Sequence, residues 1–244
     1  MKRTVALLFG LALVLGGGDL AADDATPVVV ELFTSEGCNS CPPADKFLGE
    51  LTARSDVLPL AFHVDYWDYL GWPDRFASPY FTQRQRAYAR ALGSAMVYTP
   101  QAVVDGTAHI VGSDRGGLEA LIEDAARSAP TVAIDLAWTA KGDLEITVPA
   151  APYQGDATVW FVRYDDHGIS EVTDGENAGK TLHHVNIVRE LKAIGMWNGA
   201  PFTAVLPAEA VRPADGGTAF GCAIIIQPEG LGPVLGARRI AAMG

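Results

Sequence analysis

Two cysteines separated by two residues, Cys38 and Cys41, are the side chains of this sequence best suited to chemistry. They lie in the segment GCNSCPPAD, after a run of β-branched residues and before a segment with helical spacing. Such a pair can exchange a disulfide for two thiols, bind a metal ion or form a permanent structural bond. A structural zinc site needs two further ligands, and no second Cys-x-x-Cys or Cys/His pair supplies them. Zinc is therefore the least favoured of the three interpretations.

The position of the pair between a strand and a helix favours redox chemistry. A thiolate at the start of a helix faces free backbone N–H groups and the positive end of the helix dipole. Both lower the pKa of a cysteine and activate it as a nucleophile. We therefore expect Cys38 to attack and Cys41 to act as the resolving thiol.

Strand-like and helix-like segments alternate over residues 26–129. The run TPVVVELFTS is typical of a strand buried on both faces, and the following helix tolerates Pro42 and Pro43 only in its first turn. Asp105-Gly106 predicts a tight hairpin between two strands. The predicted order is β-α-β-α-β-β-α. Two helical crossovers then imply parallel strand pairs in a mixed sheet covered by helices.

Residues 130–244 have a different rhythm, with seven short β-like runs separated by turn-rich segments. This spacing predicts an all-β, sandwich-like second domain. Ser128 to Pro130 is the expected boundary. Cys222 lies within one of these runs, where we expect a small buried hydrophobic residue.

The first half resembles the thioredoxin fold. The resemblance rests on Cys-x-x-Cys at a strand-to-helix junction, Thr99-Pro100 before the third strand, the Asp-Gly hairpin and a closing helix. It implies that Pro100 is cis and packs beside the cysteines, and that Thr99 offers its backbone to a bound substrate. It also implies a buried carboxylate that accepts a proton from the resolving thiol. Glu31 is the acid on the preceding strand; the alternative is a solvent-facing glutamate at a strand end.

Four segments resemble, more specifically, an exported bacterial family catalogued as a thioredoxin-like domain of unknown function: ELFTSEGCNSCPPAD, HVDYWDYLGW, YTPQ and GENAGKTLHHVNIVR. The likeness covers nearly the whole chain after the N-terminal segment. The pair Asn39-Ser40 differs from the proline or histidine that many thioredoxin-like oxidoreductases carry between their cysteines. This difference leaves the redox potential open.

Two other segments are expected near the cysteines. The connector after the second strand is rich in aromatic residues and contains Tyr66, Trp67 and Trp72, which either bind an extended substrate or cover the core. Tyr98 and Gln101 flank Thr99-Pro100 and are placed at the same surface.

The segment DGENAGKTLHHVNIVR is interpreted as a polar loop that folds back over the cysteines, followed by a strand. On that strand, His183 and His184 would point to opposite faces.

The N-terminal residues 1–22 have the pattern of a secretory signal, with Lys2 and Arg3, a short apolar run and small residues. Export would place the cysteines where a disulfide persists, in the periplasm or outside the cell. The net charge of −11 argues against nucleic acid or anionic lipid as a partner. No later segment approaches the length of a membrane span.

These features predict an exported thiol-disulfide oxidoreductase that exchanges electrons with protein thiols, disulfides or peptides and needs no cofactor. The alternative from another class is a non-catalytic thioredoxin-like binding protein with a structural 38–41 disulfide. Such a protein would hold a peptide or Cu(I), because two thiolates suit that ion.

Overall fold

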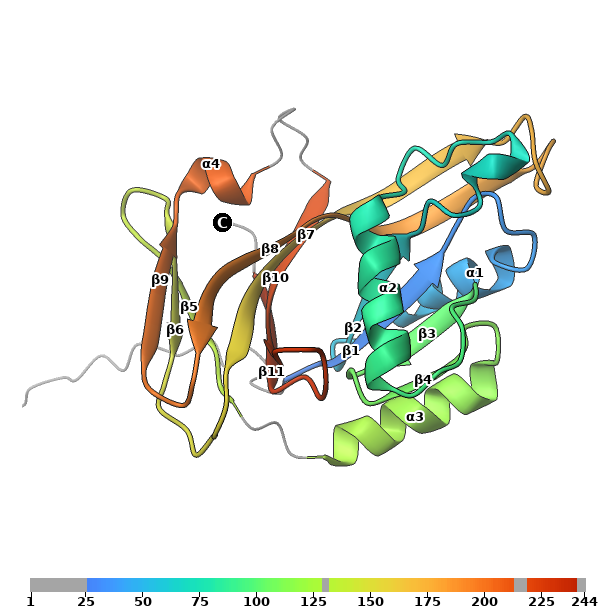
Figure 1. Ribbon diagram of the computed structural model, residues 1–244. Coiled ribbons are helices and arrows are strands. Elements are labelled where there is room, and N and C mark those ends of the chain that lie inside the picture. The colour runs from blue at the N-terminus through green and yellow to red at the C-terminus, as the bar shows by residue number, and fades with distance from the viewer. Residues whose placement is uncertain (1–25, 129–131, 213–218, 241–244) are drawn as a thin grey trace, which may run out of the picture.

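The computed structural model describes residues 26–128, 132–212 and 219–240 (Figure 1). The predicted signal segment 1–22 and residues 129 and 130 of the predicted boundary lie outside these ranges. Among the described residues, no helix is long and apolar enough to cross a membrane.

The first half follows the predicted order of strands and helices, with one short 3₁₀ helix, η1, inserted after the second strand. Its elements are β1 (Val28–Thr34), α1 (Pro42–Leu51), β2 (Val57–His63), η1 (Asp68–Leu70), α2 (Pro79–Ala91), β3 (Gln101–Val104), β4 (Ala108–Val111) and α3 (Arg115–Arg127).

Local sequence signals set the boundaries of these elements. Pro42 and Pro43 open α1, where a missing N–H costs no helical hydrogen bond. The Ser78 side chain caps α2 by accepting a hydrogen bond from the Tyr80 N–H. Asp105 and Gly106 have positive φ angles of 50° and 68°, the geometry of the tight β3–β4 turn.

The second half contains all seven predicted strands and one short helix. Its elements are β5 (Asp135–Trp138), β6 (Leu144–Val148), β7 (Ala157–Glu171), β8 (Thr181–Trp197), β9 (Phe202–Leu206), α4 (Ala208–Val211), β10 (Phe220–Pro228) and β11 (Gly236–Ile240). The strands β7 and β8, of 15 and 17 residues, form a hairpin much longer than the sequence predicts.

The strands form one mixed sheet of eight strands, in the order β11-β10-β7-β8-β2-β1-β3-β4, and a separate sheet of three, β5-β6-β9. The second half was expected to form a sandwich by itself. Instead, β8 pairs with β2 in parallel at Ala61 and Ile187, so four strands of the second half extend the sheet of the first. Hydrophobic residues on both faces of β7 and β10 suit a strand inside a sheet rather than one with an exposed face.

One predicted strand direction also differs. The first crossover joins the parallel strands β1 and β2, as expected. The second crossover does not give a parallel pair, because β3 runs antiparallel to β1. The segment after α2 returns the chain to the carboxyl end of β1, where Gln101 begins β3 opposite Phe33.

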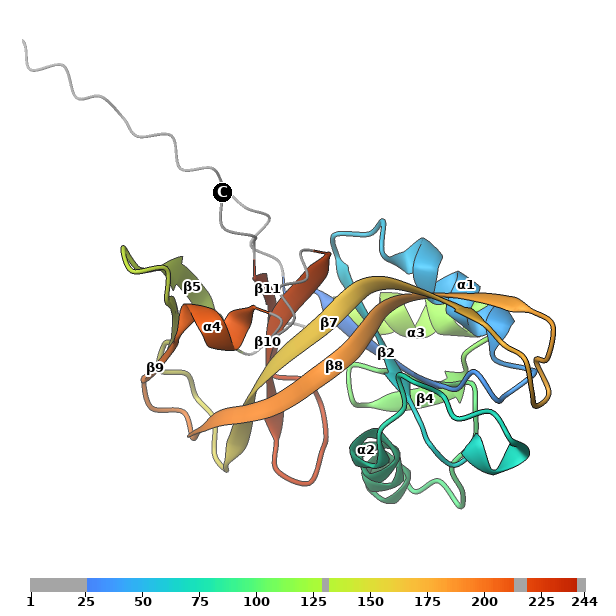
Figure 2. The same cartoon turned by 90° about the horizontal axis from the view of Figure 1, so that it is seen from above.

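Helices cover both faces of the sheet in the first half, with α1 and α3 on one face and α2 on the other (Figure 2). Val30, Leu32 and Phe47 belong to the core beneath α1 and α3. Val29, Phe33 and Tyr88 belong to the core beneath α2. Alternate residues of β1 therefore face opposite helical layers, and the side on which a β1 side chain lies is fixed by its place in the strand.

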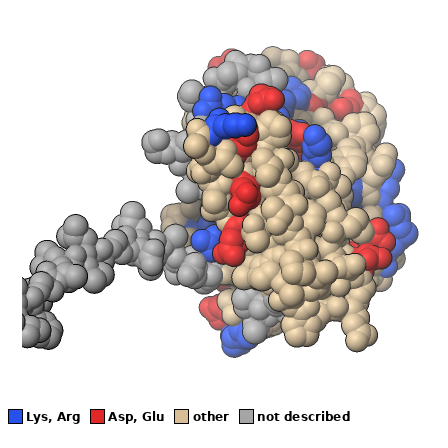
Figure 3. Space-filling view, turned by 90° about the vertical axis from the view of Figure 1, so that its left-hand side faces the viewer, with Lys and Arg blue, Asp and Glu red and all other residues tan. Residues whose placement is uncertain are grey.

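The three-stranded sheet packs against the β7–β10 part of the large sheet over a third core, which contains Ile146, Phe161, Trp197 and Ile224. The two sheets face each other across this core, but the larger one also contains the strands of the first half. The outer face of the three-stranded sheet, over β5, β6 and β9, is mostly uncharged (Figure 3). Val205 on β9 is exposed there.

Candidate active site

A disulfide joins Cys38 and Cys41 in the connection between β1 and α1. The two Cα atoms are 5.5 Å apart, within the range typical of disulfides. Cys38 is only 1% exposed and Cys41 is fully buried, whereas Asn39 and Ser40 between them are exposed. The bond therefore lies near the surface, but its sulfur atoms are covered.

The start of α1 differs from the environment expected for Cys38. Cys41 is the N-cap residue, and Pro42 and Pro43 at the first two helical positions carry no N–H. The first N–H of the helix is that of Ala44, and it donates to the Cys41 carbonyl. Ser40 Oγ lies 3.3 Å from Cys38 Sγ. This hydroxyl belongs to the Asn39-Ser40 pair between the cysteines and can donate a hydrogen bond to a Cys38 thiolate.

The Thr99–Pro100 peptide bond is cis, as the resemblance implies. Trp67 links it to the cysteine loop, because its Nε1–H donates to Thr99 Oγ1 at 2.8 Å. Trp67 also packs on Gly37, where a β-carbon would lie 2.9 Å from Trp67 Cβ. Glycine at position 37 thus allows the aromatic segment to lie directly against the residue before Cys38.

The other predicted binding residues lie in different environments. Tyr66 and Trp67 pack against the core and are half-buried. This position is compatible with both expected roles, covering the core and binding an extended substrate. The oxygen of Tyr98 lies 2.8 Å from His109 Nδ1. Gln101 is fully buried and accepts a hydrogen bond from Gln85, so its side chain is not available to a substrate.

Glu31 is buried, but it lies on the α2 side of the sheet. Its carboxylate accepts two hydrogen bonds from Arg84, at 2.6 and 2.7 Å, and one from Tyr88. Val29 and Phe33, on the same side of β1, belong to the core beneath α2. The structure therefore pairs Glu31 with α2 and does not place it with the cysteines; the alternative of a solvent-facing glutamate is also wrong.

A buried group of acids and histidines lies next to the cysteine loop instead. It consists of Glu36, Asp45, His63, Asp74 and His184, each no more than 6% exposed. His63 Nδ1 lies 2.7 Å from Asp74 Oδ2, which also accepts the Glu36 N–H at 2.9 Å. His184 Nε2 lies 3.5 Å from Glu36 Oε1 and its Nδ1 lies 3.9 Å from Asp45 Oδ2.

The surroundings of this buried group shift the pKa values of its members in different directions. Burial raises the pKa of Asp45 and outweighs the opposing effects of His184, His63 and the Thr34 hydrogen bond. Burial alone would lower the pKa of His63, but the adjacent Asp74 outweighs it and the pKa of His63 is raised. Burial would raise the pKa of Asp74, yet His63 and two backbone N–H groups hold it below its usual range.

Glu36 connects this buried group to the aromatic segment. Its Oε2 accepts a hydrogen bond of 2.6 Å from Trp72 Nε1, so Trp72 contributes to the site through its ring nitrogen. Burial tends to raise the pKa of Glu36, but hydrogen bonding, first of all with His184, lowers it overall. Four members of the group, Glu36, Asp45, His63 and His184, lie in the segments that carry the family resemblance, and Asp74 lies outside them.

The loop before β8 folds back over the cysteines, as expected. Asn177 is buried and donates to the backbone of the cysteine loop, and Glu176 accepts from it. His184 is buried and His183 is exposed, so the two histidines do point to opposite faces.

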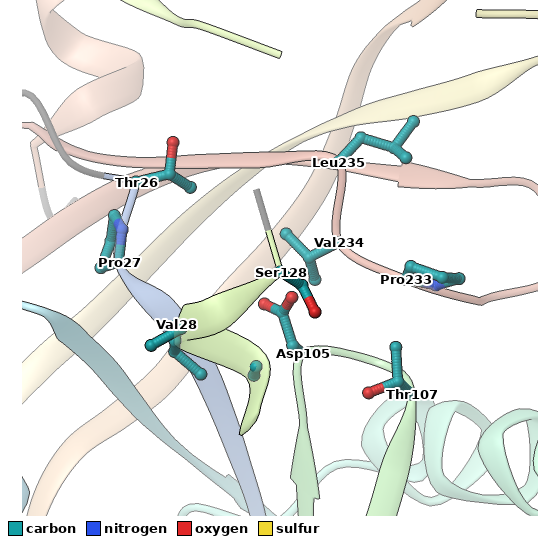
Figure 4. Close-up of a pocket in the computed structure, with 11 residues that line it drawn as sticks. Thr26, Pro27, Val28, Asp105, Thr107, Ser128, Pro233, Val234 and Leu235 are labelled. Atoms are coloured by element: carbon teal, nitrogen blue, oxygen red, sulfur yellow. The ribbon is translucent and has the colours of Figure 1, made fainter. Parts of the chain in front are cut away.

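A hollow of about 430 Å³ lies at the amino-terminal end of β1, whereas the cysteines follow its carboxyl end (Figure 4). Asp105, Ser128 and Val234 are among its lining residues. Burial raises the pKa of Asp105 to about 6. Within the described residues, no group of three or more His, Cys, Asp or Glu side chains is arranged to hold a metal ion.

Comparisons with known proteins identify a family but no activity. Residues 29–227 match the family described as protein of unknown function (DUF1223). No curated protein is similar to this chain.

Solved structures similar to this protein include the following two. The crystal structure of protein AGR_C_4864 from Agrobacterium tumefaciens is 36% identical, with a TM-score of 0.77 over 90% of this chain and 96% of that one. The structure of HBP35 of Porphyromonas gingivalis is 13% identical, with a TM-score of 0.62 over 88% of this chain and 75% of that one, and is similar in fold alone. The family match covers most of the chain, and we conclude that this protein belongs to the DUF1223 family of proteins of unknown function.

Proposed function

We propose that this protein is an exported thiol-disulfide oxidoreductase whose first half is a thioredoxin-like domain. The strand order β2-β1-β3-β4, with α1 and α3 on one face and α2 on the other, supports the assignment of the fold. The observation that carries the function is the Cys38–Cys41 disulfide at the β1–α1 junction, linked through Trp67 to the cis Thr99–Pro100 bond. A disulfide also suits an exported protein, because the cytosol keeps thiols reduced.

In the proposed reaction the reduced protein transfers two electrons to a substrate disulfide. The Cys38 thiolate attacks one substrate sulfur, forms a mixed disulfide and releases the other substrate sulfur as a thiolate, which takes up a proton. Cys41 then loses its proton and attacks the Cys38 sulfur, which expels the second substrate thiolate and restores the Cys38–Cys41 bond. The reverse sequence oxidises a substrate dithiol.

Two groups of the site support these steps. The Ser40 hydroxyl, 3.3 Å from Cys38 Sγ, can donate a hydrogen bond to the thiolate. We propose that a buried acid on the α1 side, Asp45, takes the proton of Cys41 in place of Glu31. Asp45 follows Cys41 by one helical turn, and its N–H donates to the Cys41 carbonyl at 3.1 Å.

The burial of both sulfur atoms favours a second candidate, a peptide-binding protein in which the disulfide is only structural. The two candidates differ in redox potential and in turnover. A structural disulfide has a potential below about −300 mV and no activity.

The test is to equilibrate the protein with glutathione buffers and to follow insulin reduction by dithiothreitol. We expect a potential above about −300 mV and turnover that Cys38→Ser abolishes. Cys41→Ser should accumulate the mixed disulfide, because the resolving thiol is absent. Cys222→Ser is the matched control, since the Cys222 thiol is buried in a different core and burial raises its pKa to about 12. A lower potential without turnover would leave the binding protein as the better proposal.

A further inference from the structure

The turn between β7 and β8, residues 172–180, reaches the cysteine loop from the far end of a long hairpin. We call it the hairpin tip. β8 pairs with β2 at Ile187, and the preceding part of β8 continues towards the cysteine loop (Figure 1). The tip therefore belongs to the second half of the chain but lies at the active face of the first half.

Asn177, at the centre of the hairpin tip, is fully buried. Its side-chain N–H₂ donates to the Glu36 carbonyl at 2.8 Å and to the Cys38 carbonyl at 3.0 Å. Its Oδ1 accepts a hydrogen bond of 2.8 Å from Lys180 Nζ, which holds the amide in this orientation. One side chain thus satisfies two carbonyl groups on either side of Gly37.

Glu176 makes a further bond to the same loop. Its Oε2 accepts the backbone N–H of Asn39 at 3.2 Å. The hairpin tip therefore hydrogen-bonds to three residues of the cysteine loop, and Asn39, between the two cysteines, is one of them. With Trp67 against Gly37 on the aromatic side, the loop is held from two directions.

These contacts oppose the access that thiol-disulfide exchange needs. An attacking thiolate must approach a disulfide sulfur directly, and Cys38 is only 1% exposed. If Asn177 leaves, the Glu36 and Cys38 carbonyls need new hydrogen-bond donors, because buried carbonyl groups are costly when unpaired. An extended polypeptide can supply such donors through its backbone N–H groups, whereas a small thiol has few.

We propose that the hairpin tip is a displaceable cover of the Cys38–Cys41 pair, with Asn177 as its positioning residue, and that it selects extended polypeptide disulfides over small ones. The inference rests on the proposed redox function of the same pair. Displacement of Asn177 by the substrate backbone uncovers Cys38, and the tip closes again when the substrate leaves.

The test measures access to the disulfide with tris(2-carboxyethyl)phosphine. This reagent reduces the disulfide to two thiols and takes one oxygen atom from water to become a phosphine oxide, so no enzymatic turnover is needed. Asn177→Ala removes two hydrogen bonds to the cysteine loop, and we expect its disulfide to be reduced about 10-fold faster or more. Asn198→Ala, in the exposed turn at the other end of β8, is the matched control and should keep the wild-type rate. Equal rates of disulfide reduction in the wild type, Asn177→Ala and Asn198→Ala would overturn the proposal that the hairpin tip is a cover.

A second variant keeps the test decisive if Asn177→Ala does not fold. Glu176 is exposed, so Glu176→Ala removes only its bond to Asn39. We expect faster hydrogen exchange at the Asn39 amide and faster reduction of the disulfide. An unchanged exchange rate at Asn39 together with an unchanged reduction rate would also overturn the proposal.

Substrate choice separates the cover from the redox function. The ratio of reduction rates for a peptide disulfide and for oxidised glutathione should fall in Asn177→Ala, because the variant admits small disulfides. Faster phosphine reduction in a protein that turns over no substrate would support the cover and refute the oxidoreductase. If Asn177→Ala turns over substrates with the wild-type ratio and is reduced by the phosphine at the wild-type rate, the oxidoreductase is supported and the cover is refuted.

Discussion

At the scale of single residues, the buried pair of His63 and Asp74 connects β2 with the segment that follows it. Both side chains are fully buried and 2.7 Å apart. Removing or neutralising only one partner of a buried ion pair strongly destabilises the folded protein. The charge state of His63 should therefore control stability near neutral pH.

The sign of this dependence follows from the pKa of His63, which Asp74 raises in the folded protein. The stabilisation is fully present below the pKa of an unfolded histidine, about 6.5, and is lost as the pH rises through the higher pKa of folded His63. Asp74→Asn removes the largest of the effects that raise the pKa of His63 and leaves Asp45 and Glu36 to oppose burial. The variant should therefore lose stability relative to the wild type mainly at acidic pH, where the wild-type stabilisation is fully present.

Urea unfolding between pH 5.5 and 8.5 measures this prediction. The free energy lost by Asp74→Asn relative to the wild type should be greatest at the acidic end, by about 2 kcal/mol, the usual size of a hydrogen bond to a charged group. Asp135→Asn, at an exposed position on β5, is the control and should run parallel to the wild type. A constant difference between Asp74→Asn and the wild type across this range would contradict a charged His63.

At the scale of elements, the β3–β4 turn joins the two halves as well as two strands. Gly106 has a φ of 68°, and a β-carbon there would overlap the Gly232 carbonyl oxygen in the loop between β10 and β11. The Asp105 carbonyl also accepts the Val234 N–H at 2.9 Å. The turn that the Asp-Gly dipeptide predicts thus has a second requirement, close backbone contact, which the dipeptide does not reveal.

We predict that Gly106→Ala lowers the free energy of unfolding by about 2 kcal/mol or more, because it combines an unfavourable φ with a backbone overlap. Gly116→Ala is the matched control, since α3 leaves open space around that position and alanine favours a helix. Chemical denaturation of the three proteins measures the difference. Equal stability of Gly106→Ala and the wild type would argue against the contact with Gly232.

At the scale of the whole molecule, the two halves share one sheet and one core. The core beneath α2 contains residues of β7, β8 and β10 and of the segment before and within β11, namely Val162, Tyr164, Val188, Leu191, Ala223, Ile225, Val234 and Ala237. Arg84 of α2 also donates to Gln227 of β10 at 3.0 Å. Removal of the second half would expose this core and leave β2 as a free edge.

We therefore predict that a fragment of residues 26–128 does not fold by itself, whereas residues 23–244 unfold in a single cooperative transition. Circular dichroism of the fragment and urea unfolding of the longer chain followed by two probes, near- and far-ultraviolet, provide the measurement. A cooperative transition in the isolated fragment would instead support two independent domains on either side of residues 128–130.

Strong local signals in the sequence predicted the elements and much of the cysteine site. Periodicity, the prolines of α1 and Asp105-Gly106 are signals that depend on nearby residues, and the structure contains the corresponding strands, helices and turn. The disulfide and the loop over it were also expected from the residues around Cys38 and Asn177.

Only the tertiary structure decided which distant residues meet. The side of the sheet on which Glu31 lies, the gathering of Asp45, His63 and His184 behind the cysteines, and the continuation of the first sheet into β8 all depend on strand register and strand order. The sequence determined local conformation, because that depends on neighbouring residues. It did not determine the partners of the buried charges, because partners such as Glu36 and His184 come from different elements that meet only when the core closes.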